Sequence, residues 1–116
     1  MRALLVVVCL FSPLLATSAE PPAQFAICSA CHTTTADGAN SMGPNLRGVV
    51  GRKAGTAPGF QYSEAMKKSG IRWSPQELNS FLTDVTAKVP GTLMPFPGLP
   101  DANDRQAVIA YLTSLK

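Results

Sequence analysis

Beyond its first nineteen residues the chain has two cysteines and one histidine, and all three fall within five positions. Cys28 and Cys31 are separated by two residues, and His32 follows at once. Cysteines at i and i+3 lie on one face of a helical turn, so both thiols can bond to the same rigid partner. The adjacent imidazole is directed at that partner too. The motif therefore favours a fold built around a bound group.

The composition also indicates that a bound group is needed. About 40% of residues 20–116 are apolar, and about 19% are glycine or proline. Globular domains usually have about 45–50% apolar residues and about 12% glycine plus proline. A single domain this short, with few apolar residues, needs disulfides, a metal or a large cofactor to be stable.

Residues 1–19 are typical of a secretory signal peptide. Arg2 supplies a positive charge, Ala3–Leu15 is apolar, and the segment ends in small residues at Ala19. A retained membrane anchor is the alternative, but an anchor needs about 20 apolar residues, and this run is shorter and contains Pro13. We expect cleavage after about Ala19, export to the periplasm, and no stable membrane insertion of residues 20–116.

The C-x-x-C-H spacing is the one used for covalent haem attachment. A thioredoxin-like pair would follow a strand, but only eight residues of the mature chain precede Cys28. A structural zinc ion needs four Cys or His ligands, and the mature chain has three such residues. A Cys28–Cys31 disulfide is the simplest alternative, but it leaves His32 without a role.

A haem iron bound by His32 has a sixth position, and its occupant decides the function. Met42 is close to His32 in sequence, and Met66 lies in a predicted helix, where packing is the commoner role. Met94 lies in the proline- and glycine-rich segment 89–98. A stiff loop of this kind is suited to presenting one side chain at a fixed distance.

Two helices are predicted from caps and apolar stripes. Ser74 and Pro75 start one of them, with Glu77 as the acid of a capping box, and Asp101 caps the last helix. The stripe positions, spaced as one helix face, are Leu78, Phe81, Leu82 and Val85 in the first and Val108, Tyr111, Leu112 and Leu115 in the second.

The rest of the chain is predicted to contain a first helix that carries Phe25 into Cys28, and a shorter one between Ser63 and Gly70. No strand-like alternation occurs. The glycine-rich segment 38–59 is long for a loop unless it wraps around something.

Seven motifs follow one another along the chain: Cys28-Ser29-Ala30-Cys31-His32, Gly43-Pro44-Asn45-Leu46, Gly51-Arg52-Lys53-Ala54-Gly55, Ala57-Pro58-Gly59-Phe60-Gln61-Tyr62, Ile71-Arg72-Trp73, Pro90-Gly91-Thr92-Leu93-Met94-Pro95-Phe96 and Ala110-Tyr111-Leu112. In this order they resemble the class I c-type cytochromes, the branch with mitochondrial cytochrome c and its soluble bacterial relatives. The resemblance covers about residues 25–115.

The resemblance implies an all-α cytochrome c fold: three main helices and a short one, wrapped with long loops around one covalently attached haem c. It implies thioether bonds to Cys28 and Cys31, and His32 and Met94 as axial iron ligands. Pro44 would accept a hydrogen bond from the proximal imidazole. The other implied pocket residues are Arg52, Tyr62, Trp73 and Thr92 around the propionates, Phe81 in the distal pocket and Phe96 at the exposed haem edge.

Two departures from the family pattern lead to further expectations. Leu93 stands where a lysine is usual, so the docking face should be more apolar and electron transfer less sensitive to salt. The charges left for steering are Lys53, Lys67, Lys68, Arg72 and Lys88. Pro21-Pro22 should shorten the first helix, so the sequence does not decide whether this helix contacts Tyr111.

These observations predict a monomeric periplasmic one-electron carrier and not an enzyme. Its partners would be redox proteins, such as a cytochrome complex, dehydrogenase, oxidase or reductase, that dock transiently at the haem edge. The alternatives are a dedicated subunit of one periplasmic dehydrogenase and, less favoured without a distal His or Arg, a haem peroxidase or small-molecule binder. Nine scattered basic and seven acidic residues in the mature chain do not indicate nucleic-acid binding.

Overall fold

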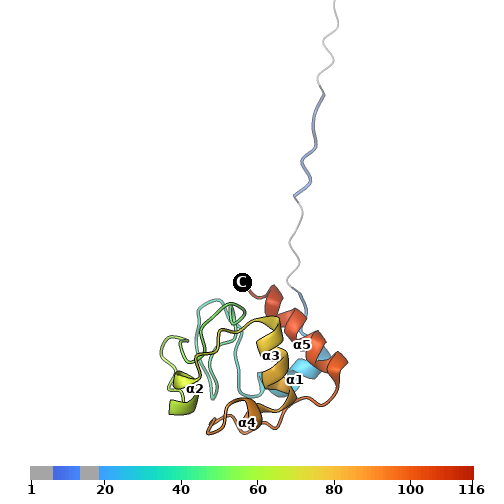
Figure 1. The fold of residues 1–116 in the computed structure, drawn as a ribbon. Helices are drawn as coiled ribbons and strands as arrows, with labels where there is room; N and C mark the ends of the chain where they lie inside the picture. Colours follow the sequence, from blue (N-terminus) through green and yellow to red (C-terminus); the bar gives the residue numbers. More distant parts are fainter. Residues whose placement is uncertain (1–6, 14–18) are drawn as a thin grey trace, which may run out of the picture.

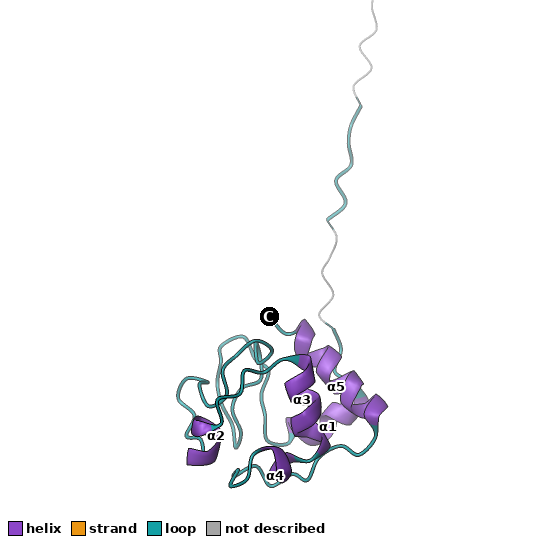
Figure 2. Cartoon of the chain, viewed as in Figure 1, coloured by secondary structure: helices purple, strands orange, loops and turns teal. Residues whose placement is uncertain are grey.

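The computed structural model describes residues 7–13 and 19–116. Its helices are joined by long loops, and the described part of the chain contains no strand (Figures 1 and 2). The elements are η1 (Ala23–Phe25), α1 (Ala26–Ser29), α2 (Glu64–Lys68), α3 (Pro75–Thr83), α4 (Val85–Lys88) and α5 (Ala102–Ser114). The predicted all-α class is confirmed.

The two longest helices, α3 and α5, pack against each other and begin at the predicted caps. The Ser74 hydroxyl accepts a hydrogen bond from the Glu77 amide at 3.1 Å. The Asp101 carboxylate accepts from the amides of Asn103 and Asp104 at 2.8 and 3.1 Å. These side chains satisfy amides that a helix start leaves unpaired.

One boundary differs from the prediction: the apolar stripe from Leu78 to Val85 does not form a single helix. Helix α3 ends at Thr83 because Asp84 is extended, with φ −155° and ψ 100°. The Asp84 carboxylate instead caps α4 by accepting from the Ala87 amide at 3.1 Å. Val85 is fully buried, so its apolar character reflects the core and not the helix period.

The first helix is short, as the two prolines predict, because η1 and α1 together span residues 23–29. Its contact with the last helix is nevertheless made. The rings of Phe25 and Tyr111 meet edge to face with centroids 4.8 Å apart. One aromatic pair therefore joins the two ends of the domain.

The short helix α2 lies where it was predicted, capped by Ser63, with Gly70 at φ +70° beyond its end. Loops occupy most of the chain between α1 and α2, and a single antiparallel bridge pairs Lys53 with Arg72. In Figure 1 these loops and α2 lie on the side of the domain opposite α5. The loops therefore form the side of the domain that faces away from α5.

Residues 7–13 form no helix and lie outside the folded domain (Figure 1). Phe11, for example, is 97% exposed. The predicted signal peptide otherwise falls on residues 1–6 and 14–18, which lie outside the described residues. Among the described residues, no helix has the length and apolar character needed to cross a bilayer.

Candidate haem site

A single large cavity occupies the middle of the domain. Its volume is about 1040 Å³, and its wall is mainly apolar. Residues of η1, α1, α2, α3, α5 and the connecting loops reach it. All eleven predicted site residues line it: Cys28, Cys31, His32, Pro44, Arg52, Tyr62, Trp73, Phe81, Thr92, Met94 and Phe96.

The motif cysteines are placed by α1 and the turn that ends it. The amides of Cys31 and His32 both donate to the Cys28 carbonyl, at 3.1 and 2.9 Å. Both cysteines are free thiols and are not joined in a disulfide. Burial raises the pKa of the Cys28 thiol above its ordinary value. Two unlinked thiols thus lie one helical turn apart at the cavity wall.

The imidazole of His32 is fixed by the backbone that follows the motif. Its Nδ1 lies 2.8 Å from the Pro44 carbonyl oxygen, which can only accept, so Nδ1 donates and Nε2 keeps a free lone pair. Burial lowers the pKa of His32, although the Pro44 hydrogen bond opposes this effect. The tautomer and the neutral state are those that metal ligation requires.

Gly43 allows this arrangement because the backbone runs directly against the ring. A Cβ atom at this position would lie 2.5 Å from Cε1 of His32 and 2.7 Å from its Nδ1. The Gly43 amide also donates to the Cys31 carbonyl at 2.8 Å. Any larger residue would displace the imidazole from the Pro44 carbonyl.

The segment carrying Met94 alternates in exposure. Thr92, Met94 and Phe96 are half-buried toward the cavity, and the residues between and after them, Leu93, Pro95 and Pro97, are exposed. The Met94 amide donates to the Thr92 hydroxyl at 3.2 Å, which stiffens the turn before Met94. Met66 also lines the cavity and packs on the core, whereas Met42 is 76% exposed at its rim.

The polar and aromatic wall residues have defined neighbours. Arg52 donates to the Asn45 carbonyl at 3.0 Å, and the Tyr62 hydroxyl accepts from the Ala57 amide at 3.1 Å. Trp73 is 6% exposed and packs on Phe81, with ring centroids 5.0 Å apart. These contacts fix the side chains around one part of the wall.

Asn45 is a structural residue that sequence reasoning did not identify. It is 4% exposed, and its amide nitrogen donates to the Thr35 carbonyl at 3.0 Å while its oxygen accepts from the Arg47 amide at 2.8 Å. It thereby organises the loop that presents Pro44. A lone asparagine beside a Gly-Pro pair gives no sequence signal for this role.

The residues present fit a haem c. A flat macrocycle needs a wide apolar space, two thiols at one edge and an axial imidazole, and the cavity provides all three. The thioether of Met94 lies on the same wall. A thioether is a soft ligand, suited to iron in an apolar environment of this kind. A haem c accounts for the two cysteines, the histidine and the methionine together.

Comparisons with known proteins agree with this chemistry. The family model described as Cytochrome c matches residues 22–116. Cytochrome c2 iso-2 of Magnetospirillum molischianum is 47% identical over 98 residues, covering 84% of this chain and 100% of that protein. Cytochrome c-type cyt cy of Rhodobacter capsulatus is 51% identical over 88 residues, covering 76% of this chain and 43% of that protein.

The fold has a solved counterpart. The structure of cytochrome cH from Methylobacterium extorquens superposes with a TM-score of 0.74 at 47% sequence identity. The match covers 78% of this chain and 91% of that one. At this identity the likeness extends beyond the fold to the family.

Replacing Gly43 with alanine should disturb the site more than its size suggests. The new Cβ would meet the His32 ring at 2.5 Å, so the ring or the backbone must move. We expect a loss of about 1–3 kcal/mol in unfolding free energy, typical of overpacking. Urea unfolding of the haem-loaded protein measures this. Gly48→Ala measures backbone strain alone, since its Cβ has open space but its φ is +73°; a Gly43→Ala variant as stable as the wild type would contradict the packing argument.

Proposed function

The chain belongs to the cytochrome c family of electron carriers, and from this premise we propose that it is a periplasmic one-electron carrier with His32 and Met94 as axial iron ligands. The observation that carries the proposal is the shared cavity. Segments 62 positions apart in sequence bring one imidazole and one thioether to the same apolar wall as the two motif cysteines.

The chain's own groups favour electron transfer over chemistry on a substrate. Bound haem c exchanges one electron between its ferrous and ferric states. The Pro44 carbonyl holds the His32 ring in one orientation, so little need move when the charge changes. The apolar wall disfavours additional positive charge, and the Met94 thioether favours the ferrous state. Both effects raise the reduction potential.

An enzymatic reading has little support from the residues. Peroxide cleavage needs a general base or a cation on the side of the haem opposite the proximal ligand, and His32 is the single histidine of the sequence. Arg52 is engaged with the Asn45 carbonyl. A strong carbon monoxide adduct of the native ferrous protein would contradict the carrier proposal.

Permanent docking to one dehydrogenase is the second candidate. It is favoured by the exposed apolar positions Leu93, Pro95 and Pro97 beside Met94. Co-purification of a second polypeptide with the native protein, at equal stoichiometry, would select this candidate over a free carrier.

The ligand assignment predicts that replacing Met94, and neither of the other two methionines on the cavity wall, removes one absorption band. The ferric protein should show the weak iron–sulfur band at about 600–750 nm. Met94→Ala should abolish the band, because no thioether then reaches the iron. Met42→Ala and Met66→Ala are matched controls, since both side chains line the same cavity. If the band persists in Met94→Ala and disappears in either control, the assignment is wrong.

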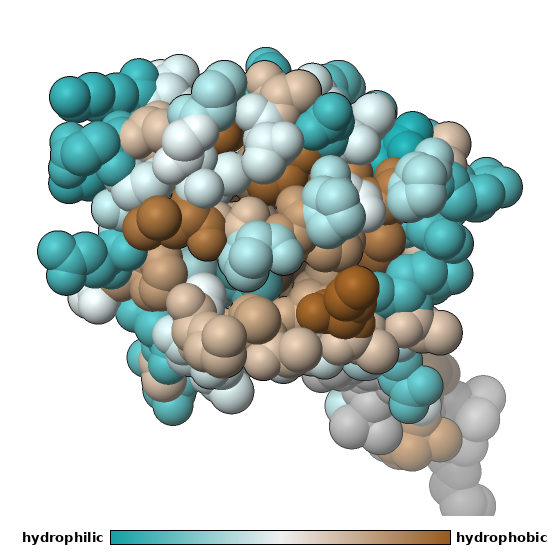
Figure 3. Space-filling model, turned by 90° about the horizontal axis from the view of Figure 1, so that it is seen from below, coloured by the Kyte–Doolittle hydropathy of each residue, from teal (hydrophilic) through white to brown (hydrophobic). Residues whose placement is uncertain are grey.

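The proposed docking face is apolar. Ile27, Met42 and Leu93 lie at the cavity rim with exposures of 55%, 76% and 75%. Figure 3 shows several brown, apolar side chains on the face seen from below, among tan and pale teal ones, and the most hydrophilic side chains lie at its margins. Three of the five expected steering charges are paired: Lys67 and Lys68 with Glu64 at 2.5 and 3.8 Å, and Lys88 with Glu77 at 2.7 Å.

Electron exchange should therefore depend weakly on salt. Between about 10 and 200 mM NaCl we expect the self-exchange rate of the protein, measured by NMR, to change less than about threefold. Leu93→Lys should slow exchange at low salt and make it salt-dependent, because like charges would meet at the docking face. Ala110→Lys adds the same charge on exposed α5 and should have little effect. A tenfold change in the wild-type protein would contradict the proposal.

Export predicts a defined mature product. Expressed in a bacterium with a haem-attachment system, the protein should appear in the periplasmic extract as a chain starting at Glu20 and carrying one haem. Intact mass spectrometry measures both features. Recovery of the full 116-residue chain in the membrane fraction would instead favour a retained anchor.

A further inference from the structure

The segment that carries Met94 is loosely bonded along its length. Among the described residues, the hydrogen bonds of residues 89–96 join only positions between 85 and 94, and the Pro97 carbonyl accepts from the Val85 amide at 3.3 Å. The far end is well anchored: the Leu99 amide donates to the Leu82 carbonyl at 2.7 Å, and Arg105 donates to the Leu99 carbonyl at 2.7 Å. The position of Met94 therefore depends on how the other end of the segment, its near end beside α4, is held.

The near end begins at Lys88, the last residue of α4, whose ammonium lies 2.7 Å from the Glu77 carboxylate. Glu77 was predicted to close a capping box at the start of α3, but its carboxylate reaches across to α4 instead. The Lys88 side chain is 27% exposed and that of Glu77 39% exposed. The Glu77 oxygen that faces Lys88 is shielded from solvent. This ion pair is thus partly buried.

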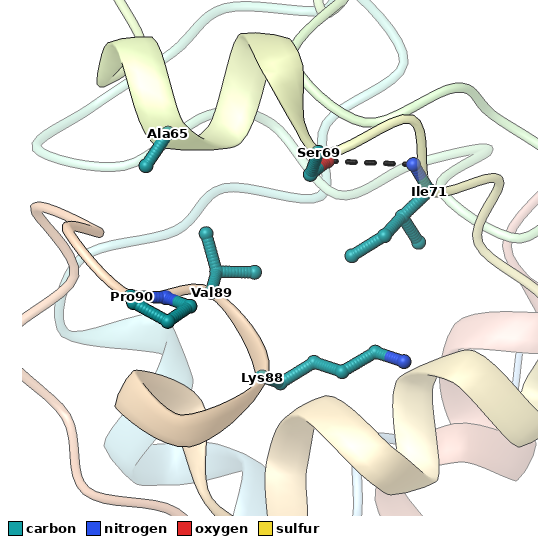
Figure 4. Close-up of a pocket in the computed structure, with 6 residues that line it drawn as sticks. All are labelled: Ala65, Ser69, Ile71, Lys88, Val89 and Pro90. Carbon is teal, nitrogen blue, oxygen red and sulfur yellow. Dashed lines mark hydrogen bonds between the residues drawn. The ribbon is translucent and has the colours of Figure 1, made fainter.

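On its other side, the near end borders a groove. An open groove of about 290 Å³ separates α2 from the end of α4, lined by Ala65, Ser69, Ile71, Lys88, Val89 and Pro90. Figure 4 shows the Lys88 side chain extended along this groove below Ile71, and not pointing toward Ala65 or Ser69 of the α2 region. The Lys88 ammonium is therefore paired with Glu77 of α3 and not with a residue of α2. The next residue, Val89, is buried in the core.

We propose that Glu77 and Lys88 are a positioning pair that keeps Met94 on the iron. The inference rests on the proposed ligand role of Met94. Release of Met94 requires the segment to swing outward from its near end, since the Leu82–Leu99 bond fixes the other. That movement pulls Lys88 away from a shielded carboxylate oxygen. The ion pair opposes it, so loss of the pair makes the sixth position easier to reach.

Binding of external imidazole to the ferric haem protein tests this proposal, because imidazole binds only when Met94 leaves. Glu77→Gln and Lys88→Gln should each raise imidazole affinity about two- to fivefold, the effect of a partly exposed ion pair. The double variant should add little to either single change, since both remove the same interaction. Lys88→Arg keeps the charge and should bind imidazole like the wild type.

Glu64→Gln is the matched control, since Glu64 forms ion pairs with Lys67 and Lys68 of its own helix, α2, and these pairs do not involve α4. Equal imidazole affinity in all variants, or an equal rise in Glu64→Gln, would overturn the positioning role. Urea unfolding checks that each variant is folded under the assay conditions. If the far-red band of Met94→Ala matches the wild type, the ligand assignment itself fails, which is a separate result.

Discussion

The fold depends on a bound group that fills the central cavity. A cavity of about 1040 Å³ lies within the domain, which the family model matches over residues 22–116. The apolar side chains around such a space lose packing contacts and are exposed to water unless a bound group fills it, which destabilises the fold. A domain of this size has about 5–15 kcal/mol of stability in total. The polypeptide therefore needs a bound group to support the inward faces of α3 and of the loops, and the family's haem c supplies one. Folding and cofactor attachment are consequently linked.

The features predicted from sequence are those with local chemical causes. Ser74 and Asp101 cap their helices because a short side-chain oxygen beside a free amide works in any tertiary context. The Cys28–His32 motif places its groups together because one helical turn determines their spacing. Met94 was assigned by its proline-framed surroundings and by resemblance, and the cavity contains it together with every other predicted site residue.

The features that sequence did not predict depend on distant partners. The stripe ending at Val85 has helical spacing, yet Asp84 interrupts the helix and starts another, because the chain turns there toward the core. Glu77 has the position of a capping-box acid, but Lys88 competes successfully for its carboxylate. The Phe25–Tyr111 contact forms although the first helix is short, because it requires only that the Phe25 ring be placed against Tyr111 and not a long helix–helix interface.

The alternation of residues 92–97 separates two properties within one short segment. All six residues line the cavity, but Thr92, Met94 and Phe96 are half-buried, whereas Leu93, Pro95 and Pro97 are exposed. Substitutions at the exposed positions mainly change the surface that partners meet, and substitutions at the half-buried positions mainly change the surroundings of the iron, so specificity and potential can evolve largely separately. Insertion or deletion of one residue would exchange the two sets of side chains, as a register slip does in a strand. Selection should therefore conserve the length of this segment more strictly than its outward composition.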